Sequence, residues 1–310
     1  MSKSNKILLV VFIVLGGVYL ANKYWLSSGN RNFKTTLVAL DTALVTKIEV
    51  ISPENDKKPV VLTKQGMDWL AESGSIKDEA DKSVVNGMLI KMVSMNPDRL
   101  LGSSKAQWDA NQVSDSLATH VKVYANDDLL ADFYVGKFNF QPTSRTMSTS
   151  VRLVGEEEVY AVEGYLAAMF NKAFDGFRDK TFIHTTPEDV ESVQFIYPQD
   201  SSFTLSKTLS GWSVDGVEVD SLTVRNYIKG LSQVKFRKFR DDFAASSTSP
   251  LYSMVIATTN KDESVVSVYQ DEQGMTIHSS QNDNAYFTDE GVKVFDKLLV
   301  PRAKFKKPGE

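Results

Sequence analysis

Residues 60–69 read VVLTKQGMDW, and residues 203–212 read FTLSKTLSGW. In both stretches an apolar run ends in a lysine, and a tryptophan follows five positions later, at Trp69 and at Trp212. A glycine-containing turn signal lies between the lysine and the tryptophan, so each stretch predicts two strands joined by a tight turn. The recurrence of the pattern predicts that the chain contains the same structural unit twice.

The sequence around each stretch repeats in the same order. Residues 45–50 and 190–195 alternate apolar and polar positions, which predicts a strand before each hairpin. Asp81 and Asp220 each precede apolar residues at helical spacing, which predicts a helix with an aspartate cap. Further strand patterns follow, and each copy closes on a tyrosine and a short helical pattern. Chance matching of two β-rich halves is the alternative to a duplication. The closing tyrosines are Tyr160 and Tyr286.

These patterns predict an α+β fold. We expect an N-terminal transmembrane helix followed by two tandem homologous modules of mainly antiparallel sheet with packed helices, because the connections between strands are short. The length of 310 residues suits about two domains of average size. The expected boundaries are an anchor over 1–29, a first module over 30–182 and a second module over 183–310.

The N-terminus carries an apolar segment, Ile7–Leu26, whose one charged residue is Lys23. A bilayer core needs roughly 20 helical residues, and Lys23 can extend toward the headgroups. We therefore expect an uncleaved anchor rather than a signal peptide, with the N-terminus inside and the modules outside, although the flanking charges nearly balance. Small and aromatic residues of this segment are candidates for contact with a partner helix or the membrane interface. These are Gly16, Gly17, Tyr24 and Trp25.

Composition argues against several kinds of site. The net charge of −4 gives no cationic field for a polyanion, so we expect no nucleic-acid partner. The chain has no cysteine and three histidines, and no nucleotide-binding, metalloprotease or nucleophile-elbow motif occurs. We therefore expect no catalytic residue, no cofactor, no metal site and no small-molecule substrate. A hydrolase assembled from scattered Ser, His and Asp residues is an alternative, and His120 or His278 would be its base.

A charged motif stands where the first copy ends. Its residues are Phe177, Arg178, Asp179 and Lys180. We expect Arg178 and Asp179 to form an ion pair that fixes the two modules relative to each other, because a connection between domains must satisfy its polar groups. Contact with a partner is the alternative.

A basic stretch lies in the second copy, with phenylalanines interleaved among its cations. The repeat places it on a strand, so we expect a half-buried strand whose cationic face is available to an anionic partner, either protein or lipid headgroup. The second basic stretch is the C-terminal tail, which includes Lys304. The cations of the first stretch are Lys235, Arg237, Lys238 and Arg240.

This order of features resembles a bacterial envelope family described as domain of unknown function 4340. Its members typically have an N-terminal anchor, one or two β-rich modules, and a Phe-Arg-Asp-Lys signature that corresponds here to residues 177–180. The resemblance covers nearly the whole chain after Asn30. Genes of the family often lie near ABC-2-type exporter components, including gliding-motility-like permeases and auxiliary proteins, and the family supplies no catalytic residues.

The resemblance implies a non-enzymatic, membrane-anchored accessory subunit of an ABC-type export or gliding-motility-like envelope complex. The expected location is the bacterial inner membrane, with the modules in the periplasm. The expected partners are the membrane, an integral-membrane permease and auxiliary subunits. A free-standing envelope scaffold or adhesion protein is the alternative, and the hydrolase described above is a further one.

Overall fold

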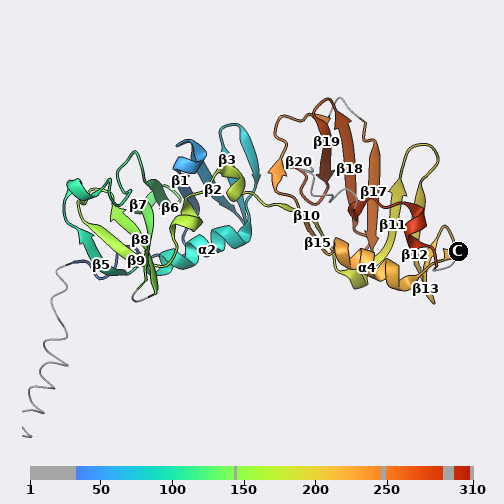
Figure 1. The fold of residues 1–310 in the computed structure, drawn as a ribbon, viewed down its shortest axis with the longest axis horizontal. Coiled ribbons are helices and arrows are strands. Elements are labelled where there is room, and N and C mark those ends of the chain that lie inside the picture. The colour runs from blue at the N-terminus through green and yellow to red at the C-terminus, as the bar shows by residue number, and fades with distance from the viewer. Residues whose placement is uncertain (1–32, 143–144, 246–248, 289–296, 308–310) are drawn as a thin grey trace, which may run out of the picture.

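The computed structural model describes residues 33–142, 145–245, 249–288 and 297–307. Two nine-stranded sheets lie side by side along the long axis of the molecule, the first on the left in Figure 1 and the second on the right. Helix α2 (Lys82–Val93) runs beneath the first sheet in that view, and α4 (Ser221–Leu231) runs beneath the second. Each sheet therefore has one helix of about three turns packed against it.

The first sheet is entirely antiparallel and has the order β4-β3-β2-β1-β6-β7-β8-β9-β5. Its strands are β1 (Lys47–Ile51), β2 (Pro59–Gln65), β3 (Asp68–Ser73), β4 (Ile76–Glu79), β5 (Pro97–Gly102), β6 (Thr119–Ala125), β7 (Asp128–Gln141), β8 (Thr146–Leu153) and β9 (Val159–Glu163).

The second sheet is also antiparallel and has the order β14-β13-β12-β11-β17-β18-β19-β20-β16. This is the strand order of the first sheet, with each strand replaced by its counterpart later in the chain. Its strands are β11 (Val190–Ile196), β12 (Phe203–Thr208), β13 (Gly211–Val214), β14 (Val217–Glu218), β16 (Lys238–Phe239), β17 (Tyr252–Thr258), β18 (Glu263–Asp271), β19 (Gly274–Ser279) and β20 (Tyr286–Thr288).

The two hairpins predicted from residues 60–69 and 203–212 are confirmed, and they have the same register. Trp69 on β3 lies opposite Lys64 on β2, and Trp212 on β13 lies opposite Lys207 on β12. Both tryptophans are buried. The lysine and the tryptophan five positions apart therefore mark one pairing position in each sheet.

Each sheet has its own hydrophobic core. The first core includes Trp69 and the buried face of α2, and the second includes Trp212 and the buried face of α4. The predicted helix caps are confirmed, because the carboxylates of Asp81 and Asp220 accept backbone N–H groups from the first turns of these helices. Such a cap satisfies donors that would otherwise lack a partner.

Short elements outside the two large sheets complete the fold. Strands β10 (Thr181–His184) and β15 (Gln233–Lys235) form a two-stranded sheet. The remaining helices are α3 (Ala167–Phe170) and the 3-10 turns η2 (Pro53–Asn55), η3 (Lys105–Gln107), η4 (Phe174–Gly176), η5 (Pro187–Asp189) and η7 (Arg302–Phe305).

The expected α+β class is wrong, because the fold is mainly β. The described residues contain twenty strands and three α-helices, and one of these helices, α3, has only four residues. The sequence suggested a second helix at the end of each module. In the first module that helix is α3, a single turn, and in the second module most of the corresponding residues lie outside the described part of the chain.

The expected N-terminal transmembrane helix, Ile7–Leu26, also lies outside the described residues, together with Gly16, Gly17, Tyr24 and Trp25. Among the helices of the described residues, none has the length and apolar character needed to cross a membrane.

Candidate functional site: the junction around Arg178

The junction segment, residues 177–181, lies between the two sheets and forms backbone hydrogen bonds with both modules. On the first-module side, the amide of Asp81 donates to the carbonyl of Phe177 at 2.8 Å, and the amide of Asp179 donates to the carbonyl of Glu79 at 2.8 Å. On the second-module side, the amide of Phe236 donates to the carbonyl of Lys180 at 3.1 Å. The segment thus forms one antiparallel β-bridge with the end of β4, between Arg178 and Ala80, and leads into β10, which pairs with β15.

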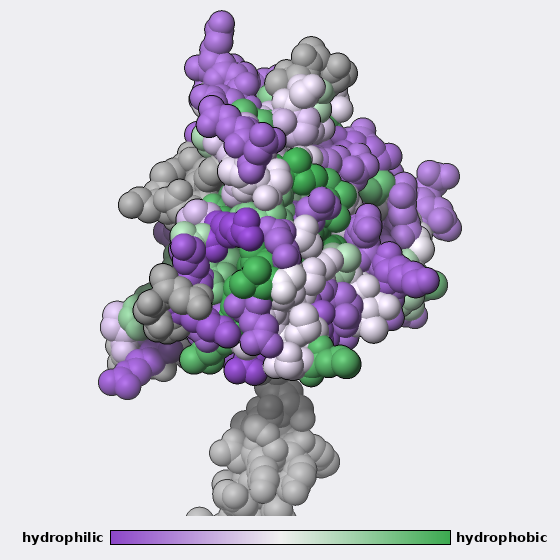
Figure 2. Space-filling model, turned by 90° about the vertical axis from the view of Figure 1, so that its right-hand side faces the viewer, coloured by the Kyte–Doolittle hydropathy of each residue, from purple (hydrophilic) through white to green (hydrophobic). Residues whose placement is uncertain are grey.

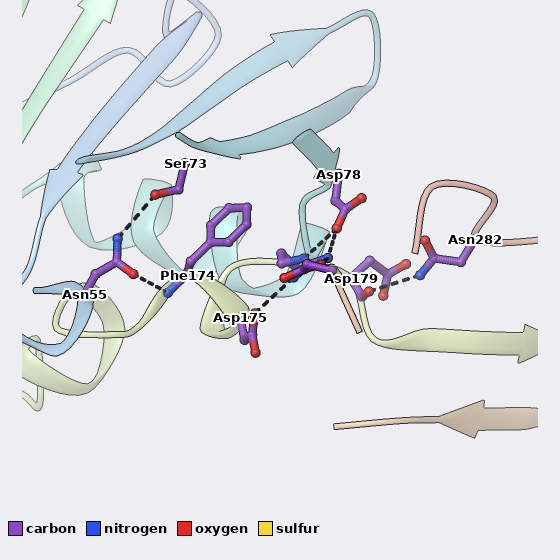
Figure 3. A network of polar contacts seen from close by, with 9 residues as sticks. Asn55, Ser73, Asp78, Phe174, Asp175, Asp179 and Asn282 are labelled. Carbon is purple, nitrogen blue, oxygen red and sulfur yellow. Dashed lines mark hydrogen bonds and ion pairs between the residues drawn. The ribbon is translucent and has the colours of Figure 1, made fainter. Parts of the chain in front are cut away.

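The side chain of Arg178 binds acidic residues from both modules. Figure 3 labels the two that belong to the first module, Asp78 and Asp175. Its Nε donates to Oδ2 of Asp78, on β4, at 2.5 Å. Its two terminal nitrogens donate to the two carboxylate oxygens of Asp241, just after β16, at 2.9 and 2.6 Å. A third carboxylate, that of Asp175, accepts at 3.1 Å. The planar fork of arginine suits this two-point contact with a carboxylate.

Aromatic rings complete the surroundings of the guanidinium. The ring centroid of Phe239, on β16, lies 3.4 Å from the central guanidinium carbon, and that of Phe174 lies at 5.1 Å. Arg178 is 1% exposed, so water does not solvate its charge. Stacking on the ring face adds a cation–π attraction, which is stronger for a desolvated cation.

Burial and charge act against each other at this cluster. Burial alone would lower the pKa of Arg178, but its hydrogen bonds to Asp241 and its pairing with Asp78 raise it. Burial raises the pKa of Asp78, and Arg178 opposes that rise. Arginine stays charged in proteins, so a buried cation faces three carboxylates, and two of these reach it from different modules. The arrangement joins the modules and has no free donor directed at a ligand.

The expected ion pair between Arg178 and Asp179 is wrong. The carboxylate of Asp179 accepts instead from the amide of Thr181 at 2.9 Å, and its carbonyl accepts from the side chain of Asn282 at 3.1 Å (Figure 3). Adjacent residues on an extended segment point to opposite sides, so Arg178 and Asp179 cannot both face the same partner.

The other two junction residues have separate roles. Phe177 is fully buried in the first core. Lys180 is half-buried, and burial lowers its pKa, with Asp175 acting in the opposite direction. Phe182, two residues further along, already belongs to the second core, so the chain passes from one core to the other within the junction.

The basic stretch is divided between exposed and buried residues. Lys235, Arg237 and Lys238 are exposed on or beside the short strands β15 and β16. Arg240 is 7% exposed and donates to Asp242 at 2.9 Å and to Asp271 at 2.7 Å. The expectation that Arg240 belongs to an accessible cationic surface is therefore wrong, because its charge is already neutralised inside the fold.

The histidines that a hydrolase would need have local partners. Nε2 of His120 pairs with Asp132 at 2.5 Å, and the His120 ring stacks on Tyr134 with 4.4 Å between ring centroids. Nε2 of His278 lies 3.0 Å from the carbonyl of Asp283. No hydrogen bond joins either imidazole to a serine hydroxyl within the described residues. In that same part of the chain, no group of three His, Asp or Glu residues is placed to hold a metal ion.

Sequence reasoning missed the partners of Arg178. Asp78 is 100 positions before it and Asp241 is 63 positions after it, and nothing local links the three. It also missed Arg152, which is buried between the rings of Trp108 and Tyr134, at 3.7 and 4.2 Å. The only available signal was the acidic pair that directly follows the basic stretch, of which Asp241 is the first member.

Comparison with protein families places the junction inside a recognised domain. The family model described as Domain of unknown function (DUF4340) matches residues 75–252, which extend from the turn before β4 to the start of β17. The match therefore crosses the junction and contains Arg178, Asp78 and Asp241. No curated protein matches the chain. Because the match covers more than half of the 310 residues, the chain belongs to the family Domain of unknown function (DUF4340).

Proposed function

We propose that this protein is a non-enzymatic extracytoplasmic subunit that binds other proteins of an ABC-type export or gliding-motility-like envelope complex. Its partners in this proposal are an integral-membrane permease and its auxiliary subunits. The apolar segment 7–26, which lies outside the described residues, supports attachment to the bacterial inner membrane. The observation that carries the binding role is an exposed apolar patch on the first module.

The hairpin patch consists of Phe138, Phe140 and Met147, on the hairpin formed by β7 and β8, together with Tyr165, which follows β9. Phe140 lies directly opposite Met147 in the strand pairing, and these side chains are 55% and 50% exposed. The ring centroids of Phe138 and Tyr165 are 4.6 Å apart. Phe138 and Phe140 lie two positions apart on β7 and therefore on the same face of the strand, which groups the four side chains. Contiguous exposed apolar residues of this kind mark interaction sites, and aromatic residues and Met are enriched at interfaces.

Two residues of the patch, Phe138 and Phe140, lie on a strand that is longer than its counterpart in the second module. Strand β7 has 14 residues, whereas its counterpart β18 has nine. At the far end of the second module, hydrophobic residues form small areas bordered by hydrophilic ones (Figure 2). The lengthened hairpin thus supplies an apolar surface that the repeated framework does not require.

The junction supports the same role. Arg178 joins Asp78 of the first module to Asp241 of the second, which favours a fixed arrangement of the two sheets. A subunit that positions partners relative to one another needs such an arrangement. A free-standing scaffold would need it too, and identification of the partner distinguishes the two functions.

We further propose that the two sheets descend from duplication of one unit. Their equal strand order and the shared Lys–Trp pairing position support this proposal. A crystal structure in which the two modules superpose, with Trp69 on Trp212, is the expected result. Non-equivalent positions of the two tryptophans would refute the duplication.

The binding role is tested by capture of the tagged full-length chain from membranes in mild detergent. We expect the chain to co-purify with permease and auxiliary subunits, and Phe140→Ser to abolish this association while the fold is retained. Met67→Ser is the matched control, because Met67 is 93% exposed on the β2–β3 turn of the same module and lies outside the patch. Equal capture by the wild-type chain and Phe140→Ser would exclude the patch as the contact.

A further inference from the structure

The second module contains an open cavity of about 390 Å³ between α4, β15 and the C-terminal segment. Lys235 of β15, Lys297 and Lys304 of η7 line it, together with Tyr227 of α4. Lys235 comes from the middle of the second module, whereas Lys297 and Lys304 both come from the C-terminal segment. Lys235 belongs to the first basic stretch and Lys304 to the basic tail, so the fold brings the two basic stretches together at one cavity.

No carboxylate lines this cavity within the described residues. Four other lysines form ion pairs in that part of the chain, namely Lys34, Lys82, Lys207 and Lys307. Among the described residues, Lys235, Lys297 and Lys304 form no ion pair, and the only carboxylate there that is shown to act on one of them is that of Asp81, through its electrostatic attraction to Lys235. In a chain with a net charge of −4, three such lysines at one cavity are a local concentration of positive charge.

One part of the cavity wall opposes this charge. The C-terminal end of α4 contributes Gly230 and Leu231, and a helix C-terminus carries a partial charge of about −0.5. Three ammonium groups outweigh that charge severalfold, so the cavity stays positive. The positive charge of the lysines is therefore greater than the partial negative charge of the helix end.

One of the cations is held in place by its neighbours. The ammonium of Lys304 lies 5.4 Å from the centroid of the Tyr227 ring. The hydroxyl of Tyr227 donates to the carbonyl of Leu298 at 2.6 Å, which fixes the ring. A cation above an aromatic face is attracted to it, so Lys304 is oriented at the cavity before any ligand binds.

We propose that this cavity binds a phosphate group. Lysine binds phosphate as a point charge with three donors, and three such groups can surround a tetrahedral anion. The volume of about 390 Å³ lies within the range of small-molecule sites and exceeds what inorganic phosphate fills, so the phosphate belongs to a larger molecule. Two sources share this chemistry: a soluble phosphate ester and the phosphodiester headgroup of an anionic lipid. The site is independent of the hairpin patch and goes beyond the proposed function.

The test is equilibrium dialysis of the full-length chain in a non-ionic detergent, with two radiolabelled probes. Inorganic phosphate represents the soluble ester, and glycerophosphoglycerol represents the headgroup of phosphatidylglycerol without its acyl chains. We expect saturable binding of at least one probe at one site per chain, weakened by added salt because salt screens the attraction. Tighter binding of phosphate indicates the soluble source, and tighter binding of the phosphodiester indicates the lipid.

Two variants and one control connect binding to the cavity. Lys304→Met keeps an unbranched side chain over Tyr227 but removes the charge, and Lys235→Met removes a charge that β15 contributes to the cavity. Each should weaken binding at least tenfold. Lys306→Met is the control, because Lys306 is an exposed tail residue that is not among the residues lining the cavity. The Lys306→Met protein should bind the probe with the affinity of the wild type. The absence of saturable binding of either probe, or equal affinity in all four proteins, would overturn the proposal.

Discussion

Arg178 and Asp241 form a two-point ion pair between the junction and the second module, with nitrogen–oxygen distances of 2.9 and 2.6 Å. The same guanidinium binds Asp78 of the first module, so one buried side chain connects both modules. A buried charge is stable only with its partners in place. The junction is therefore the point at which a single substitution should affect the whole molecule most.

Replacement of Arg178 by Met should lower the free energy of unfolding by about 3–5 kcal/mol, because it leaves the carboxylate of Asp78 buried without a counter-charge. Urea denaturation measures the change. Arg99→Met is the control, since Arg99 pairs with Asp98 on the surface, and surface substitutions usually change stability by less than about 0.5 kcal/mol. Adding Asp78→Asn to Arg178→Met should recover part of the loss. No recovery would show that the lost stability does not come from the unpaired carboxylate.

Asp241→Ala should loosen the two modules relative to each other while each core stays folded. The chain has no cysteine, so Met67→Cys and Leu209→Cys introduce two spin labels on exposed turns, one in each module. Distance measurements by electron paramagnetic resonance should give one narrow distribution in this labelled chain and a broader one after Asp241→Ala. An equally narrow distribution in the variant would mean that Arg178 and Asp241 do not fix the arrangement.

The cap of α2 predicts a specific dependence of stability on pH. Burial acts to raise the pKa of Asp81, but hydrogen bonds from Ser83 and Val84 outweigh it, so the pKa is lowered in the folded chain. A lowered pKa adds stability above the unfolded value, about 3.9, and that stability is lost as the pH falls through the folded pKa. Asp81→Asn keeps a capping side chain but does not titrate. Between pH 5 and pH 3, the wild type should therefore lose more unfolding free energy than Asp81→Asn, measured by urea denaturation. Equal losses would contradict the role of the ionised cap.

Trp69→Ala and Trp212→Ala should each destabilise the protein by about 3–5 kcal/mol, because both indoles are buried in a core. Denaturant unfolding monitored by circular dichroism gives the two values. Met67→Ala, on the exposed turn beside Trp69, is the control and should have little effect. A cost below about 1 kcal/mol for either tryptophan would contradict its place in the core.

The local parts of the fold could be predicted from the sequence. The Lys–Trp hairpins and the caps at Asp81 and Asp220 depend on residues a few positions apart, and alternation, turn signals and helical spacing report such contacts directly. The helix content was overestimated, because short apolar patterns next to turns suggested helices. In the first module, the pattern after Tyr160 forms only the single helical turn α3.

The candidate site could be predicted only as a motif. The sequence singled out Arg178, but its partners Asp78 and Asp241 are brought to it by the packing of two separate sheets. The prediction that the basic stretch forms an accessible cationic surface was wrong at Arg240 for a similar reason. Arg240 meets Asp271 on the neighbouring part of the sheet, and no pattern within 235–240 indicates that contact.

The most direct measurement of the proposed function is site-specific photo-crosslinking in living cells. A benzoylphenylalanine at position 140, in the hairpin patch, should crosslink to a permease or auxiliary subunit of an ABC-type complex. The same probe at position 67, exposed on the same module but outside the patch, should not. Crosslinks from position 67 alone, from neither position, or from position 140 only to proteins unrelated to such a complex would contradict the account.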